Sequence, residues 1–181
     1  RSSDLMFEHS ILRAATKSFA GAAMPAADLK KCWEHCLATA DISRHLASKV
    51  GISGELAQTA GLLHDIGRFG LAAAEPVKHH GLIAGHPQID VMETELELFG
   101  IDHTTAGRIV CEQFQLPDHI LLVAGRHHDH LDVTETDLLA VVSVACSVAS
   151  AVGFSVVPRS APPTLEAIVA QAPLALRPFV S

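Results

Sequence analysis

The sequence predicts an all-α fold, a single bundle of helices, and three observations lead to this prediction. Apolar residues recur at helical spacing along most of the 181 residues, whereas neither alternating strand patterns nor Asn-Gly hairpin turns occur. Hydrophobic residues make up 49% of the chain and charged residues 18%, which excludes a disordered chain. A chain of this length can bury a sizeable core, and no low-complexity linker divides it into two domains.

The limits of the expected helices follow from residues that typically start or stop a helix. Gly51, Gly67 and Gly100 are expected stops, and Asp102 is an expected N-cap. Thr134 and Asp137 are expected to cap a long apolar helix together. In chain order, the predicted helical segments are 5–19, 28–50, 53–67, a short piece within an irregular connection over 74–87, 88–100, 103–114, 117–125, 138–157, and a short helix in the Pro-rich tail.

The same pattern divides the chain into a helical lead-in over 1–28, a core over 29–157 and a tail over 158–181. The first residue is Arg1 rather than methionine, so we expect a piece of a longer protein with a truncated lead-in.

The segment 138–157 contains no charged residue and is almost long enough to cross a bilayer. We expect a buried core helix instead. The segment is rich in alanine and serine, contains Gly153, and lacks the basic and aromatic anchors that flank membrane spans.

Charge and cysteine usage limit the location and partners of the protein. The net charge of −7 disfavours binding to nucleic acid or to an anionic membrane. The four cysteines show no disulfide-scaffold pattern and no signal peptide is visible, so we expect a cytoplasmic protein.

The histidines carry the most informative chemistry, because 12 of them occur in a largely apolar chain. Burying imidazole or carboxylate groups is costly unless they are paired, so those placed in apolar helices either hydrogen-bond locally or hold a metal. The candidates within or at the edge of apolar helices are His35, His64, Asp65, His103, His127 and His128. The histidines expected at the surface or in loops are His45, His79, His80, His86, His119 and His130.

The motif "GLLHDIG" over 61–67 resembles the defining motif of the HD superfamily of helical, metal-dependent phosphohydrolases. The wider order of motifs is similar to that of HDOD domains, the HD-related output domains of bacterial signalling proteins. Besides this motif, the matching segments are "WEH" (33–35), "ELELFGIDHTTAG" (95–107), Leu116-Pro117 and His127-His128. The resemblance covers 29–157 and implies an HD-domain-like helical bundle.

The resemblance also implies a ligand set. In the superfamily, residues matching His35, His64 and Asp65 hold one metal together with a later aspartate. In the dinuclear HD-GYP relatives, the HD aspartate bridges to a second metal, whose histidine ligands match His103, His127 and His128. We therefore expect one or two divalent transition-metal ions, of iron, manganese, nickel or zinc, which imidazole and carboxylate ligands suit.

The chain departs from the family pattern at several positions. Cys146 replaces the late aspartate; we expect a packed core thiol, with thiolate ligation as the alternative. Arg68 replaces a lysine and is the expected phosphate-binding residue; the alternative is a solvated charge at a helix end. The GYP segment is absent, which argues against cyclic dinucleotide hydrolysis. We expect the acidic run "METELELFG" to be a solvated helix face, with Leu96 and Leu98 partly buried.

Two functions are compatible with these observations. The first is a regulatory HDOD-type module of bacterial signal transduction that retains a metal site and acts through protein partners or further domains. The second is a metal-dependent phosphohydrolase acting on a nucleotide or a related phosphate ester, so a small phosphate-containing ligand is possible. The sequence does not decide whether the protein is an enzyme.

Overall fold

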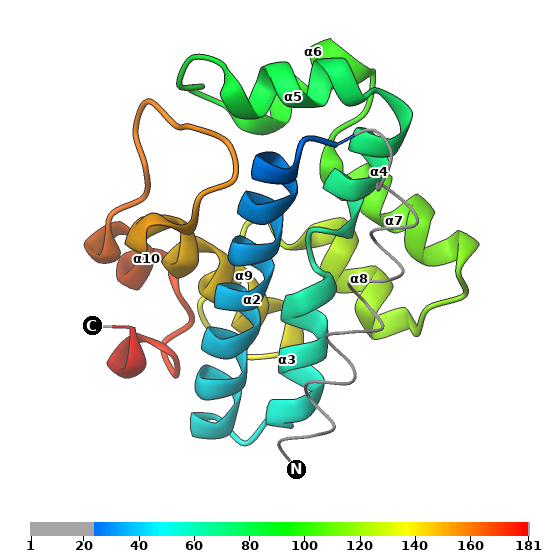
Figure 1. The fold of residues 1–181 in the computed structure, drawn as a ribbon. Coiled ribbons are helices and arrows are strands. Elements are labelled where there is room, and N and C mark those ends of the chain that lie inside the picture. Colours follow the sequence, from blue (N-terminus) through cyan, green and yellow to red (C-terminus); the bar gives the residue numbers. More distant parts are fainter. Residues whose placement is uncertain (1–23, 181) are drawn as a thin grey trace.

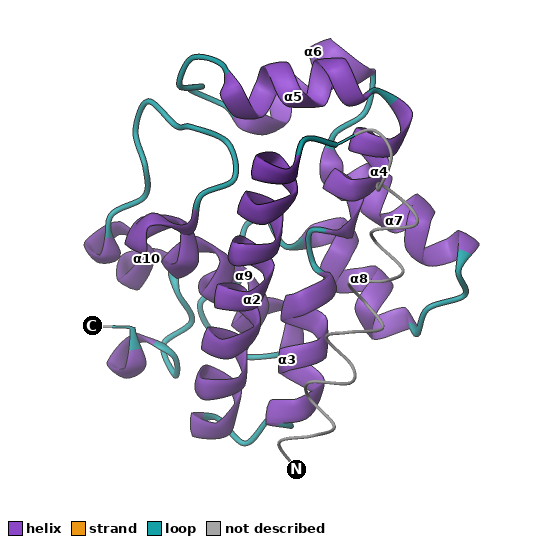
Figure 2. Ribbon diagram, viewed as in Figure 1, coloured by secondary structure: helices purple, strands orange, loops and turns teal. Residues whose placement is uncertain are grey.

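The structure, a computed structural model, describes residues 24–180. Within this range helices alternate with loops, and β-structure is limited to one isolated bridge between Gln88 and Arg159 (Figure 2). The all-α prediction is confirmed, while the helix predicted over 5–19 lies outside the described residues. The helices are α2 (Ala26–Lys49), α3 (Gly54–Leu63), α4 (Ile66–Ala74), α5 (Pro76–Ala84), α6 (Val91–Phe99), α7 (His103–Gln113), α8 (Asp118–Arg126), α9 (Leu138–Ala149) and α10 (Leu165–Gln171).

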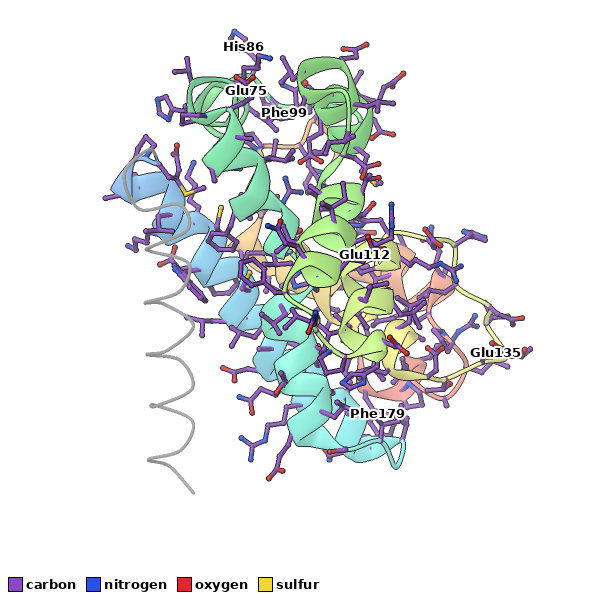
Figure 3. The ribbon with its side chains drawn as sticks, turned by 90° about the vertical axis from the view of Figure 1, so that its right-hand side faces the viewer. Glu75, His86, Phe99, Glu112, Glu135 and Phe179 are labelled. Carbon is purple, nitrogen blue, oxygen red and sulfur yellow. The ribbon has the colours of Figure 1, made fainter. Side chains whose placement is uncertain are left out.

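The long helix α2 organises the bundle, because it packs against both α3 and α9 (Figure 1). Helix α4 packs against α7, and α7 packs in turn against α8. Helices α5 and α6 form a separate layer at the end of the bundle where α2 begins (Figure 1). His86, which follows α5, points away from the bundle at this end (Figure 3).

Aspartate side chains start three of the helices. Asp90, Asp102 and Asp137 each accept a hydrogen bond from the backbone amide three residues later, at 3.0, 2.7 and 2.8 Å. The predicted N-cap at Asp102 is confirmed. The joint cap of Thr134 and Asp137 is wrong, because Thr134 bonds to Asp132 through its own amide and hydroxyl.

The predicted helix is interrupted by a turn at His64 and Asp65 and does not end at Gly67. Helix α3 ends at Leu63, and α4 begins at Ile66 and runs through Gly67. A Cβ atom at Gly67 would overlap the backbone of His103 and Gly107 on α7. This glycine is therefore required for the close approach of α4 and α7, and the stop predicted there is wrong.

A second glycine sets the distance between α2 and α3. A Cβ atom at Gly61 would lie 2.8 Å from Ser43 Oγ and 2.9 Å from Ala40 Cα, both on α2. The contact between the helices therefore depends on the missing side chain. It brings His64, just beyond the end of α3, close to His35 on α2.

The apolar segment 138–157 is a core helix in its first part, but the helix is shorter than predicted. Helix α9 ends at Ala149, and Val141 and Val142 within it are completely buried. A π-helical turn, Ser150–Phe154, follows and contains Gly153 with a φ of 105°. None of the helices among residues 24–180 combines the length and the apolar character that crossing a membrane requires.

Candidate metal centre

The structure brings the six predicted ligands together from four places in the bundle. His35 lies in α2, His64 and Asp65 form the turn between α3 and α4, and His103 is the first residue of α7. The adjacent pair 127–128 follows α8 directly. All six side chains are buried except that of His128, which is partly buried. A seventh residue, Cys146 of α9, joins them and is 4% exposed.

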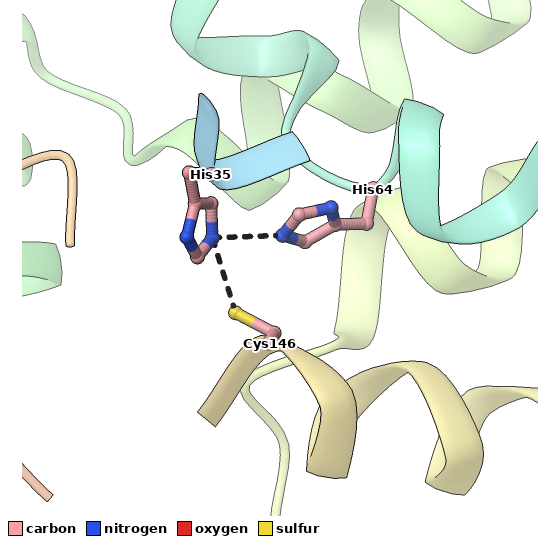
Figure 4. Close-up of side chains that lie close together, drawn as sticks. All are labelled: His35, His64 and Cys146. Atoms are coloured by element: carbon pink, nitrogen blue, oxygen red, sulfur yellow. Dashed lines mark hydrogen bonds between the residues drawn. The ribbon is translucent and has the colours of Figure 1, made fainter. Parts of the chain in front are cut away.

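His35, His64 and Cys146 form the first ligand group (Figure 4). The Nε2 atoms of the two histidines are 3.2 Å apart, and Sγ of Cys146 is 3.5 Å from Nε2 of His35. The three ligand atoms all lie within 4.8 Å of one another, so one ion could contact them all.

His103, His127 and His128 form the second ligand group, and their ligand atoms also lie within 4.8 Å of one another. The ring of His127 packs against both others, with centroids 5.4 Å from His103 and 4.3 Å from His128. This group consists of imidazoles alone.

Asp65 lies between the two groups. Its Oδ1 is 3.4 Å from Nε2 of His103 and 3.7 Å from Nε2 of His127, while its Oδ2 is 3.8 Å from Nε2 of His35. Asp65 also forms a third possible ligand set with His64 and His127. The carboxylate can therefore reach a cation in either group.

Four of the histidines are oriented by hydrogen bonds at the far side of the ring. The acceptors and Nδ1···O distances are Phe154 O for His35 (2.9 Å), Gly61 O for His64 (2.7 Å), Glu95 Oε2 for His103 (2.5 Å) and Val123 O for His127 (3.1 Å). A carbonyl or carboxylate oxygen only accepts, so each Nδ1 carries the proton. Each Nε2 then presents a lone pair to the centre, which is the arrangement typical of metal-ligating histidines.

The centre contains buried polar atoms that the protein leaves unpaired. Nε2 of His103, Nε2 of His127 and Oδ1 of Asp65 have no hydrogen-bond partner among residues 24–180. Burial lowers the pKa of His127 to about 4 and that of His64 well below its usual value, so protonation does not relieve the crowded lone pairs at neutral pH. A divalent cation would satisfy these atoms together, and the donor set fits a transition metal.

Behind the centre, the hydrogen-bonded side chains of Arg68 and Glu95 connect Asp65 to His103. Arg68 donates from Nε to Oδ2 of Asp65 at 2.8 Å and from a terminal nitrogen to Oε1 of Glu95. Oε2 of Glu95 accepts from both the amide and Nδ1 of His103. Burial alone would raise the pKa of Glu95, but Arg68 and the bond from His103 lower it to about 2. Burial likewise acts to raise the pKa of Asp65, and Arg68 and His103 hold it well below its usual range.

One alternative and one expectation about these charges are wrong. Arg68 is 4% exposed, so it is not a solvated charge at a helix end; its binding of phosphate stays a prediction. Glu95 is completely buried, so the acidic run is not a uniformly solvated face, and Leu96 and Leu98, which were expected to be partly buried, are exposed at 54% and 37%. Helix α6 turns Glu95 inward because Arg68 and His103 supply its hydrogen bonds.

One of the histidines expected at the surface or in loops is buried instead. His79 in α5 is 1% exposed, and neither ring nitrogen has a hydrogen-bond partner among the described residues. Burial lowers its pKa to about 4. The exposed ones, as predicted, are His45, His80, His86, His119 and His130.

A cavity of about 540 Å³ borders the centre and is lined by His127, His128 and Cys146. Its polar wall also includes Arg159 and Ser143. Ser143 Oγ is buried and unpaired among residues 24–180, and Arg159 makes no ion pair within that range. Sequence reasoning missed Arg159, because it lies in the Pro-rich tail, outside any motif.

Comparison with known families supports the sequence resemblance, since the HDOD domain family matches residues 6–130. The chain belongs to the HDOD family. Among solved structures, an HDOD domain protein of unknown function from Geobacter sulfurreducens superposes with a TM-score of 0.64 at 19% identity, over 84% of this chain and 53% of that one. A candidate phosphohydrolase from Shewanella amazonensis SB2B superposes with a TM-score of 0.57 at 21% identity, over 75% of this chain and 52% of that one.

At these identities the two structures show a shared fold.

Ribonuclease Y from Mycoplasma genitalium is 34% identical over 101 residues, which are 55% of this chain and 16% of the ribonuclease. The HDOD chain therefore spans about half of the two solved chains and a small part of the ribonuclease.

Proposed function

We propose that this HDOD chain is a metal-binding regulatory module of bacterial signal transduction. The convergence of Nε2 atoms and Asp65 Oδ1 carries the proposal, because the buried Nε2 atoms of His103 and His127 face Oδ1 of Asp65 and none of the three has a hydrogen-bond partner among the described residues. The cation is a divalent transition metal, one of iron, manganese, nickel or zinc, in one or two copies. The free cysteines of the described chain suit the reducing cytoplasm.

A route for the signal runs from the centre to the surface. Nδ1 of His35 donates to the carbonyl oxygen of Phe154 in the π-helical turn, and π-turns often occur at functional sites. The turn exposes two apolar side chains, Val152 at 53% and Phe154 at 42%. An ion that fixes the ring of His35 would also fix this turn. We propose that protein partners or further domains bind the turn and respond to its position.

Metal-dependent stabilisation of the folded chain tests the metal-binding part. Zinc at about 100 times its Kd should stabilise the fold by about 2.7 kcal/mol, seen as a rise in Tm. His64→Ala and His127→Ala should lose this rise, while the exposed His119→Ala should keep it. An equal rise in all three variants would place the metal elsewhere.

Hydrogen exchange tests the relay. Zinc should slow exchange in the turn over 150–154, and His35→Ala should abolish that effect. Unchanged exchange in the turn of a zinc-loaded protein would contradict the relay.

A second candidate function is hydrolysis of a phosphate ester, and the cavity beside the second ligand group favours it. A bound divalent ion would supply Lewis-acid polarisation of a phosphoryl group. Arg159, on the cavity wall and free of ion pairs among the described residues, could bind phosphate bidentately, whereas the guanidinium of Arg68 already holds Asp65 and Glu95. The net charge of −7 opposes binding to RNA, so we propose a small ester such as a nucleotide.

Hydrolysis of a nucleotide panel by the metal-loaded protein tests this candidate. Phosphate release should require metal and should fall in Arg159→Ala, with the exposed Arg126→Ala as control. No release from any nucleotide by a fully loaded protein would contradict it.

A further inference from the structure

We propose that Cys146 is a metal ligand, so that the first ligand group forms a thiolate-containing site with His35 and His64. The inference rests on the proposed metal-binding function and assigns a donor where the family pattern has an aspartate. Three separate elements supply the ligands: α2, the turn after α3, and α9 (Figure 4).

Two of the three distances in this group match those of a shared tetrahedral ion, and the third lies within 4.8 Å. With bonds of about 2.0–2.1 Å to nitrogen and about 2.3 Å to sulfur, two nitrogen ligands lie about 3.3 Å apart, and a nitrogen and a sulfur about 3.6 Å apart. The structure has 3.2 Å between the two Nε2 atoms and 3.5 Å between Nε2 of His35 and Sγ of Cys146. Asp65, with Oδ2 3.8 Å from Nε2 of His35, is the nearest candidate for a fourth ligand.

Hydrogen bonding alone does not satisfy this group. Nδ1 of His35 and of His64 is engaged with a backbone carbonyl, so both Nε2 atoms are acceptors. The only proton available between the three atoms is that of the Cys146 thiol, and it can serve one nitrogen. A divalent cation contacts all three at once and displaces that proton.

Cys146 also differs from the other buried cysteines in its surroundings. Cys36 and Cys111 belong to clusters of buried apolar side chains, where a thiol acts as a small hydrophobe. Cys146 belongs to neither of those clusters; it contacts His35 and lines the cavity with His128. Its environment is that of a ligand.

The sulfur gives the two halves of the centre different metal preferences. A thiolate favours zinc and other soft or borderline ions over manganese and magnesium. The second ligand group offers imidazole alone, with Oδ1 of Asp65 beside it. We therefore expect the first group to retain zinc or cobalt most tightly and to lose this preference when its sulfur is replaced.

Cobalt(II) spectroscopy of the full chain tests the inference. The cobalt-loaded protein should show a thiolate-to-cobalt charge-transfer band in the near ultraviolet. Cys146→Ser and Cys146→Asp should lose the band, and the matched controls Cys36→Ser and Cys111→Ser should keep it. Cys146→Asp restores the carboxylate of the family pattern, so it should still bind cobalt, which separates loss of the ligand from loss of the fold.

X-ray absorption of the zinc-loaded wild-type protein gives an independent measurement that needs no variant. One sulfur at about 2.3 Å from zinc is expected. Only nitrogen and oxygen neighbours, or a cobalt band that persists in both Cys146 variants, would overturn the inference while leaving the metal site intact. Failure to bind cobalt or zinc at all would overturn the proposed metal-binding function as well.

Discussion

Nε of Arg68 lies 2.8 Å from Oδ2 of Asp65, so a guanidinium holds one oxygen of the carboxylate while Oδ1 faces the histidines unpaired. The other end of Arg68 is held by Glu95, which in turn orients His103. The buried ion pairs thus act on the centre indirectly, by positioning two of its ligands.

Removing Arg68 should be strongly destabilising. Arg68→Ala leaves two buried carboxylates uncompensated, so the free energy of unfolding should fall by about 3–5 kcal/mol. Urea denaturation measures the change. Arg126→Ala is the matched control, because Arg126 pairs with Asp129 at the surface and the loss should be at most about 1 kcal/mol. Equal losses in the two variants would contradict the structural role of Arg68.

Removing the charge of Glu95 should weaken metal binding without removing a ligand. Glu95→Gln takes a strong acceptor from Nδ1 of His103, and outer-shell changes of this kind typically cost about 10–100-fold in metal affinity. Competition with a chelator measures the affinity. Glu97→Gln, exposed on the same helix, should leave it unchanged. An unchanged affinity in Glu95→Gln would mean that His103 does not bind the metal.

The contact between α4 and α7 should depend on the absence of a side chain at Gly67. Gly67→Ala places a methyl group against the backbone of His103 and should cost about 1–3 kcal/mol or more, because the backbone itself must shift. Gly81→Ala on α5 meets no atom within 4 Å and should be neutral or stabilising. Thermal unfolding of both variants checks the comparison, and a harmless Gly67→Ala would refute this packing.

His79 should make the stability of the fold depend on pH. Its pKa is lowered to about 4 by burial, so between about pH 6.5 and pH 4 the unfolded chain binds a proton that the folded chain excludes. The free energy of unfolding is therefore unaffected by His79 above about pH 6.5 and decreases as the pH falls below that value. The decrease is complete near pH 4 and amounts to at most about 3 kcal/mol.

His79→Leu should remove this part of the pH dependence, so the stability difference between variant and wild type should grow as the pH falls. Denaturant unfolding from pH 4 to pH 7 measures it, with the exposed His45→Leu as control. Parallel curves for His79→Leu and wild type would contradict a buried, neutral His79.

Local sequence features predict most of the helices, and the resemblance to the HD motifs predicts the histidines and the aspartate that meet at the centre. Apolar spacing and caps such as Asp102 are local features, and "GLLHDIG" carries its chemistry within seven residues. The same local reasoning misread Gly67, which resembles a helix stop but serves a contact with a helix some 40 residues later in the chain.

The sequence alone does not reveal the role of residues that depends on long-range packing. Glu95 is one of several carboxylates in an acidic run, and only the packing of α6 against Arg68 and His103 distinguishes it. His79 sits in a segment with no clear apolar period, and Arg159 reaches the cavity from the tail. Cys146 was expected to be a packed thiol, and its distance to His35 is a property of the fold.

The metal content of the purified protein tests the central claim most directly. The chain would be expressed without a histidine tag, purified without chelators, and measured by elemental mass spectrometry. We predict that each chain contains about one transition-metal ion or more. The metal should be lost in His64→Ala and His127→Ala and retained in His119→Ala. A wild-type protein that contains no such metal, and takes up none on anaerobic reloading with iron, manganese, nickel or zinc, would contradict the account.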